Sequence, residues 1–248
     1  MKGMILAAGI GTRLRPLTDH MPKALVSLGD YSMMDLAIAF LLKHGIDEIV
    51  INAHHFAQQL IDYANLKNSQ GYKISISDES NLLLDTGGGL KNAAPFFQGE
   101  HDFVLMAVDI LSDLDLTAMI AQHNRNKSLA TLAVRTRETS RSLLFDQQGN
   151  LAGWRNNQSG QQKNVQGRTP EQAYGFSGIH LLNTRIFSLM KETGAFSIID
   201  LYLRLAEMEN IKMFDHTDGL WLEFGRAEKL PSILASDEYK SILKGIFT

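Results

Sequence analysis

The chain has 248 residues, 44% of them hydrophobic and 21% charged, values that are ordinary for a globular protein with one sizeable core. Its net charge of −3 argues against a nucleic-acid partner, and the lack of cysteine excludes disulfides, thiolate metal sites and cysteine nucleophiles. The apolar run before Gly9 is too short for a signal peptide or a membrane span, so we expect a cytoplasmic protein without a membrane partner.

Strand-like and helix-like segments alternate through the first half of the sequence. Apolar or β-branched runs predict buried strands at residues 4–8, 48–52, 73–77 and 103–108. Helical patterns predict helices at 33–44, 56–64 and 89–94. This alternation is typical of an α/β fold, a Rossmann-like, mostly parallel sheet flanked by helices with its ligands at the carboxyl ends of the strands.

The second half is less regular. Strands are predicted at 129–135, 142–145, 151–154, 173–182 and 221–223, and helices at 184–192, at 198–209 and at the C-terminus. The polar segment 156–171 is expected to be a loop that moves or closes over a substrate. Because no repeat or proline-rich linker divides the chain, we predict one domain, 1–248, whose halves (about 1–110 and 111–230) share a cleft and precede a C-terminal helix.

The first predicted strand leads into a loop at residues 7–23, with the sequence AAGIGTRLRPLTDHMPK. Its glycines allow close approach of a bulky group, and its free N–H groups and basic side chains suit a polyphosphate. A Walker A loop is excluded because no Lys-Ser or Lys-Thr follows the last glycine. A dinucleotide-binding turn is excluded because Leu14 stands at its third glycine and Pro16 interrupts the helix that should follow.

The remaining pattern, Gly-x-Gly-Thr-Arg-x-x-Pro-x-Thr-x-x-x-Pro-Lys, resembles the signature of the sugar-1-phosphate nucleotidyltransferases. All of its named positions are filled: Gly9, Gly11, Thr12, Arg13, Pro16, Thr18, Pro22 and Lys23. The resemblance implies a GT-A-like fold and an Mg²⁺-dependent reaction in which a sugar 1-phosphate attacks the α-phosphorus of an NTP and pyrophosphate leaves. It implies that the NTP contacts Ala8, Gly9, Gly11, Thr12, Arg13 and Lys23, with Arg13 and Lys23 acting on its phosphates.

Two carboxylates are candidates for binding Mg²⁺, which prefers a few carboxylate oxygens and keeps several waters. Asp109 follows an apolar strand and is expected to be catalytic and a metal ligand, although a strand-end turn or helix cap would also explain it. Glu223 lies in Trp-Leu-Glu-Phe-Gly, where the family usually has Trp-x-Asp-x-Gly-Thr-Pro. The alternative for Glu223 is a solvated residue at a strand end.

A second glycine cluster, at residues 85–89, resembles the turn that contacts the nucleobase in this family, which implicates Thr86, Gly87 and Gly88. Its triple-glycine form is similar to the uridylyltransferases that act on N-acetylmuramate 1-phosphate in cell wall recycling, so UTP is favoured. Glu79 is a candidate for reading the base, and its carboxylate can accept hydrogen bonds from guanine. GTP, as in mannose-1-phosphate guanylyltransferases, is the second choice and CTP the third.

The strand at 174–179 resembles the family's sugar-binding strand, which implicates Gly175, Ser177 and Gly178. The usual Glu-Lys-Pro before it is missing, and Trp154 and Arg155 take its place. This departure and the altered segment at Glu223 leave a non-enzymatic alternative, a regulatory protein that binds sugar nucleotides. Otherwise we expect NTP and sugar 1-phosphate as substrates and a monomer or small homo-oligomer.

Overall fold

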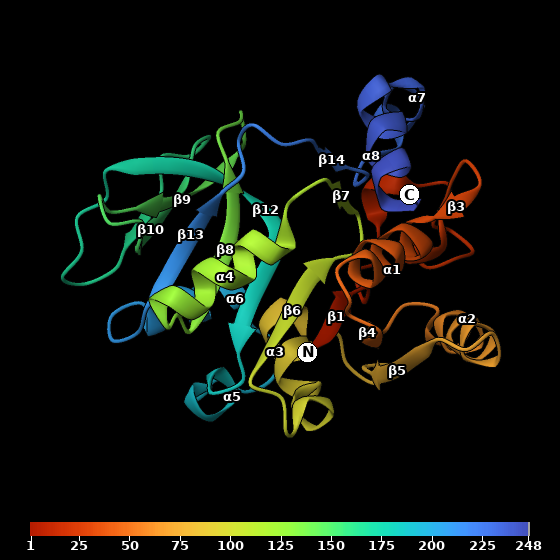
Figure 1. Cartoon of the computed structure of the whole chain (residues 1–248), viewed down its shortest axis with the longest axis horizontal. Helices are drawn as coiled ribbons and strands as arrows, with labels where there is room; N and C mark the ends of the chain where they lie inside the picture. Colours follow the sequence, from red (N-terminus) through yellow and green to blue (C-terminus); the bar gives the residue numbers. More distant parts are fainter. Residues whose placement is uncertain (248) are drawn as a thin grey trace.

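The computed structural model describes residues 1–247 and is built around one ten-stranded sheet (Figure 1). The strands of this sheet are β1 (Lys2–Leu6), β4 (Glu48–Ala53), β5 (Lys73–Asp78), β6 (Asp102–Ala107), β8 (Ala130–Arg135), β9 (Arg141–Phe145), β10 (Leu151–Asn156), β11 (Gln162–Asn164), β12 (Gln172–Asn183) and β13 (Ile211–Asp215). Two short pairs accompany it: β2 (Ser27–Leu28) with β3 (Tyr31–Ser32), and β7 (Ile110–Ser112) with β14 (Trp221–Glu223).

The helices pack against both faces of this sheet. The α-helices are α1 (Met33–Lys43), α2 (Ala57–Ser69), α3 (Asp85–Asn92), α4 (Leu116–Asn126), α5 (Ile186–Leu189), α6 (Ile198–Leu205), α7 (Leu230–Ala235) and α8 (Asp237–Phe247). The 3₁₀ turns are η1 (Thr12–Leu14), η2 (Lys23–Leu25), η3 (Ala94–Phe97) and η4 (Ala227–Lys229). Within residues 1–247, none of the helices combines the length and apolar character that a membrane-spanning segment needs.

The predicted fold class is confirmed. Strands β5, β4, β1 and β6 form a parallel block in that order, and helices flank the sheet. Beyond β6 the sheet continues with β12, which is antiparallel to it, and the second half is largely antiparallel. Figure 1 shows the parallel block on the right, in red to yellow, and the second half on the left. The helices α7 and α8 then return to the first half, where α8 packs against α1.

Both faces of the three inner strands β1, β4 and β6 are largely buried, which explains their apolar sequences, whereas the edge strand β5 alternates apolar and polar residues. Along β1, Met4 belongs to one hydrophobic cluster and Ile5 to the other, since successive side chains point to opposite faces. Helices α1, α2, α4 and α8 cover the face that contains Ile5. Helices α3, α5 and α6 cover the face that contains Met4. The active-site loops extend from a sheet that is packed on both sides.

Four segments differ from the prediction. Helix α3 begins at Asp85 and includes all three glycines, whereas a start at Gly89 was expected. Helix α4, capped by Asp115, and strand β13 were not predicted. The polar segment 156–171 is partly ordered, because β11 pairs antiparallel with β10. In each of these places tertiary packing outweighs the local signal.

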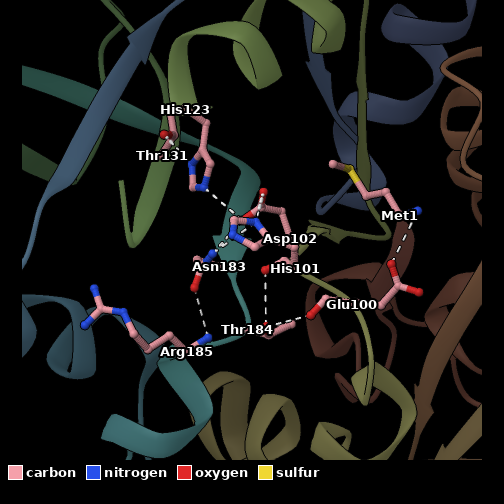
Figure 2. A network of polar contacts seen from close by, with 9 residues as sticks. All are labelled: Met1, Glu100, His101, Asp102, His123, Thr131, Asn183, Thr184 and Arg185. Carbon is pink, nitrogen blue, oxygen red and sulfur yellow. Dashed lines mark hydrogen bonds and ion pairs between the residues drawn. The ribbon is translucent and has the colours of Figure 1, made fainter. Parts of the chain in front are cut away.

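At the end of the strands opposite the candidate site, a polar network surrounds Asp102, the first residue of β6 (Figure 2). The carboxylate of Asp102 accepts from His101 Nδ1 (2.7 Å) and from Asn183 Nδ2 (2.9 Å), and His123 Nε2 lies 3.4 Å away. His123 Nδ1 in turn is 2.8 Å from the Thr131 hydroxyl. These contacts connect β6, β12, α4 and β8, so they fix the base of the strand that leads to Asp109.

Candidate active site

The loop after β1 is shaped by a left-handed glycine and a buried leucine. Gly11 has φ of 69°, and a Cβ there would lie 3.0 Å from side-chain carbons of both Lys23 and Thr18. Thr18 Oγ1 donates to the Gly11 carbonyl (2.9 Å), and Leu14 is fully buried under the loop. A Cβ at Gly9 would meet no atom within 4 Å. The loop therefore uses Gly11 for its own packing and leaves the backbone at Gly9 facing open space.

Asn52 links this loop to Glu79. Its Oδ1 accepts from the N–H groups of Ala7 (2.6 Å) and Ala8 (3.3 Å), and its Nδ2 donates to Glu79 Oε1 (2.7 Å). Glu79 is 3% exposed, and burial raises the pKa of its carboxyl group. A Cβ at Gly89 would lie 2.6 Å from Glu79 Oε1. Glu79, expected to read the base, thus joins the phosphate loop to α3 through Asn52.

Two cations of the loop face two carboxylates from distant parts of the chain. Lys23, placed in η2 directly after Pro22, donates from Nζ to Asp109 Oδ2. Arg13 Nη2 lies 3.8 Å from Glu223 Oε1. The side chains of the first pair are 15% and 12% exposed, whereas those of the second are 57% and 39% exposed. Arg13 is therefore the more accessible cation, and Thr12 beside it is also exposed.

Gly225 is the point where three of these side chains converge. A Cβ at this position would stand 3.0 Å from Glu223 Oε1 and 3.2 Å from both Arg13 Nη2 and Asp109 Oδ2. Strand β14 pairs with β7, and the Phe224 N–H donates to the Asp109 carbonyl (2.9 Å), which sets this register. The sequence analysis quoted Gly225 within a motif but gave it no role. Its lack of a side chain leaves the two carboxylates uncovered.

The carboxylates of Asp109 and Glu223 fit a magnesium ion. One oxygen of each lies within 3.2 Å of the position that a Cβ of Gly225 would occupy, so both carboxylates border the same small space. Mg²⁺ is usually bound through one or two carboxylates together with waters and substrate phosphates. Among residues 1–247, no group of three or more His, Cys, Asp or Glu side chains is arranged to hold a metal.

The residues expected to contact the nucleobase open α3 and pack against the segment before α6. Thr86 Oγ1 accepts from the Ile198 N–H (3.0 Å), and the Gly87 N–H donates to a backbone carbonyl of the same segment (2.9 Å). A Cβ at Gly88 would lie 2.4 Å from the carbonyl oxygen of Gly194. These glycines therefore have a structural reason for being small, independent of any ligand.

The three residues expected to contact a sugar lie in β12: Gly175, Ser177 and Gly178. Ser177 is fully buried and its hydroxyl pairs with His216 Nε2 (2.7 Å), so this hydroxyl is turned away from any open surface. A Cβ at Gly175 would lie 2.7 Å from Arg137 Cγ and Nε, and Gly178 has φ of 75°. From this strand, Phe176 lines a cavity beside Arg13 and Glu223.

A cavity of about 790 Å³ opens beside Arg13 and Glu223. Its cationic lining residues are Arg13, Arg137, Arg141, Arg226 and Lys229, and its acidic ones are Glu138 and Glu223. A second cavity of about 500 Å³ adjoins it and shares Arg141 and Phe176. Such an excess of positive charge in a concave surface favours anionic substrates.

The sequence analysis missed Arg137, which lines this cavity. It lies two residues beyond the last residue of β8, Arg135. The strand at 129–135 was predicted, and strand ends often carry functional side chains in α/β folds. The charge at position 137 was therefore a usable signal, but which strand β8 pairs with could not be read from the sequence.

Residues 2–143, more than half of the chain, match the family described as nucleotidyl transferase. The UTP–glucose-1-phosphate uridylyltransferase of Synechocystis sp. is 35% identical over 147 residues, which are 55% of this chain and 37% of that protein. The N-acetylmuramate alpha-1-phosphate uridylyltransferase of Neisseria meningitidis is 38% identical over 118 residues, 48% of this chain and 51% of that protein. The chain thus spans about a third to a half of the length of these curated relatives.

Solved structures share the fold over nearly the whole chain. A putative glucose-1-phosphate thymidylyltransferase from Bacillus anthracis has a TM-score of 0.77 at 20% identity, with 97% of this chain and 99% of that chain covered. The inositol-1-phosphate CTP transferase from T. maritima has a TM-score of 0.76 at 16% identity, with 99% and 95% covered. At these identities the likeness concerns the fold.

Proposed function

The chain belongs to the nucleotidyl transferase family, and from this premise we propose that it transfers a nucleotidyl group from an NTP to a sugar 1-phosphate and releases pyrophosphate. The observation that carries the proposal is the meeting of Lys23–Asp109 and Arg13–Glu223 around Gly225. Joining two anionic substrates requires neutralised charge and an in-line arrangement more than covalent chemistry. The loop cations and the two carboxylates can together neutralise and orient the two anionic substrates.

The two ion pairs suggest how the site prepares for its substrates. Each carboxylate is paired with a cation of the loop. When a triphosphate binds, Arg13 and Lys23 can turn to phosphate oxygens, Arg13 with the two-pronged geometry of a guanidinium. Asp109 and Glu223 are then free to hold Mg²⁺. In this exchange Lys23 and Asp109, the less exposed pair, each keep a partner of opposite charge.

Asp109 and Glu223 would hold the ion, and Mg²⁺ would supply charge neutralisation at the reacting phosphates. This chain's own contribution is to fix the two carboxylates through the pairing of β14 with β7. The open backbone at Gly9 allows the phosphates to approach the loop. The acceptor phosphate then attacks the α-phosphorus from the side of the cationic cavity.

We propose UTP as the first nucleotide to test, because the triple glycine at 87–89 is similar to uridylyltransferases and three relatives carry that name. A sugar of the cell wall recycling type, as in N-acetylmuramate 1-phosphate, is the first acceptor to test. GTP comes second, although four relatives are named mannose-1-phosphate guanylyl- or guanyltransferases, and CTP third, with one relative named a choline-phosphate cytidylyltransferase. Such an enzyme would act in the cytoplasm, where nucleoside triphosphates are made and used.

The test is pyrophosphate release with Mg²⁺ across the four common NTPs and a panel of sugar 1-phosphates, with Asp109→Ala as control. We expect release with one preferred pair and a loss of at least about 100-fold in kcat for Asp109→Ala, typical when a charge-stabilising group is removed from a reaction centre. Omission of Mg²⁺ should abolish release. NTP binding without turnover over the whole panel would contradict the proposal and favour a regulatory protein that binds sugar nucleotides.

A further inference from the structure

Arg137 is held at the rim of the cationic cavity by neutral groups. Its guanidinium carbon lies 4.5 Å from the centre of the Trp221 ring. Its Nη2 donates to the Phe176 carbonyl (3.0 Å), and its Nη1 is 3.4 Å from the Glu138 carbonyl. Within the described part of the chain no carboxylate forms an ion pair with it. The charge is therefore positioned but not neutralised.

The same guanidinium has a donor that nothing uses. Its Nε is buried and has no hydrogen-bond partner in residues 1–247. Burial lowers the pKa of Arg137, while the nearby Glu223 carboxylate acts in the opposite direction. An unneutralised and partly buried cation costs free energy unless an anion compensates it. Gly175 leaves the space that this side chain occupies, since a Cβ there would lie 2.7 Å from it.

Arg137 stands on the acceptor side of the candidate active site. It lines the same cavity as Arg13 and Glu223. Its stacking partner Trp221 and Glu223 are two residues apart in β14, so both point to the same face of that strand. The element that positions a metal-binding carboxylate therefore also positions the guanidinium.

Arg155, which stands where the missing Glu-Lys-Pro would have placed a cation, cannot serve in the same way. Its neighbours Trp154 and Asn156 line the adjoining cavity, whereas Arg155, between them on β10, does not. The alternation of a strand directs it to the other face, where its Nε donates to Asn157 Oδ1 (3.0 Å).

We propose that Arg137 binds an anionic oxygen group of the acceptor sugar phosphate and so determines acceptor affinity. The proposal rests on the proposed function and adds to it a substrate-binding residue. The oxyanion can come from the 1-phosphate itself or from a carboxylate on an acidic sugar. A bidentate guanidinium suits both.

The test is steady-state kinetics of wild type, Arg137→Ala, Arg137→Gln and Arg137→Lys with the best NTP and two acceptors, glucose 1-phosphate and N-acetylmuramate 1-phosphate. We expect the acceptor KM of the Ala and Gln variants to rise roughly 10- to 100-fold, the loss of one charge-assisted hydrogen bond, with the NTP KM changed less than about twofold. Lys should recover part of the affinity. A rise for both acceptors assigns the 1-phosphate, and a rise only for the acidic sugar assigns its carboxylate.

Arg155→Ala is the matched control, with an expected acceptor KM equal to that of wild type. Arg137→Gln preserves most of the length of the side chain and a donor for the Phe176 carbonyl, so it guards against a folding defect in the Ala variant. If wild type releases pyrophosphate and the acceptor KM of Arg137→Gln equals that of wild type, the role of Arg137 is refuted while the proposed function stands. If wild type releases none with any NTP and acceptor, both are refuted.

Discussion

At the scale of single residues, the two glycines of the loop after β1 have opposite surroundings. Gly11 is left-handed and touches Lys23 and Thr18, while the space beyond Gly9 is empty. The same substitution should therefore have different consequences at the two positions. We expect Gly11 to matter for the stability of the fold and Gly9 for contact with the substrate.

We predict that Gly9→Ala keeps the free energy of unfolding within about 0.5 kcal/mol of wild type, as is usual where no contact is disturbed. Its affinity for UTP should fall about tenfold or more, a loss of about 1.4 kcal/mol, because the new methyl group projects into the space left for phosphate. Gly11→Ala should lower the free energy of unfolding by about 1–3 kcal/mol through backbone strain. Urea denaturation and titration calorimetry measure both quantities. Equal stability losses in the two variants would contradict this division of roles.

The sequence could predict this loop because its glycines, cations and prolines are contiguous and each type has a chemical reason to be there. Asp109 and Glu223 were predicted from strand ends and from resemblance, and the fold brings both to Gly225. Arg137 had only a partial signal in the sequence, its charge just after a strand end, because its position also depends on β8 pairing with β12 and on a tryptophan far along the chain. Local chemistry is readable from a sequence, whereas long-range pairing is not.

At the scale of elements, α3 shows how packing overrides propensity. Three consecutive glycines at 87–89 weaken a helix, yet all three are helical here. Side chains at Gly87 and Gly88 would collide with the segment before α6, and a side chain at Gly89 would collide with Glu79 and Asn52. The sequence-based start at Gly89 was wrong for this reason, since the close neighbour is more than 100 residues away.

This packing predicts an inverted effect of alanine. Gly→Ala in a helix normally stabilises by up to about 1 kcal/mol. Gly88→Ala should instead lower the free energy of unfolding by about 1–3 kcal/mol, because its Cβ would lie 2.4 Å from a backbone carbonyl oxygen and overpack the contact. Gly245→Ala in α8 is the control, since its Cβ would meet only Lys43 Nζ at 3.8 Å. Urea denaturation measures the free energy of unfolding of both variants. A Gly88→Ala variant more stable than wild type would contradict the prediction and show that α3 can shift away from the contact.

At the scale of the whole molecule, the sheet joins a parallel block, which the sequence pattern predicted, to a largely antiparallel second half, which it did not resolve. The junction is β12 beside β6, and its interior contains two histidines. His180 is buried against the Tyr202 hydroxyl (2.7 Å), and His216 is buried against Ser177. Both rings are enclosed in the neutral form, which makes the stability of this half sensitive to pH.

Burial lowers the pKa of His216 to about 4 and that of His180 to about 3, from an ordinary value of 6.5. The pKa of each histidine is lower in the folded than in the unfolded chain. Their contribution to the free energy of unfolding is therefore complete above about pH 6.5 and is lost as pH falls toward the folded pKa values. Each histidine should lower the free energy of unfolding by up to about 1.4 kcal/mol per pH unit in this window. The raised pKa of Glu79 has the opposite effect on stability. Its contribution to the free energy of unfolding is present at low pH and is lost as pH rises above 4.5.

Urea unfolding of wild type, His216→Gln and His180→Gln between pH 7.5 and 4.5 tests this prediction. Wild type should lose stability steadily below pH 6.5, and each variant should lose it with a shallower slope, because one fewer proton is taken up on unfolding. Comparing slopes within each protein removes the fixed cost of the substitution, so a variant that is less stable at every pH remains informative. Parallel slopes in all three proteins would mean that these histidines titrate alike in the folded and unfolded chains, which their enclosure between β12, α6 and the segment after β13 argues against.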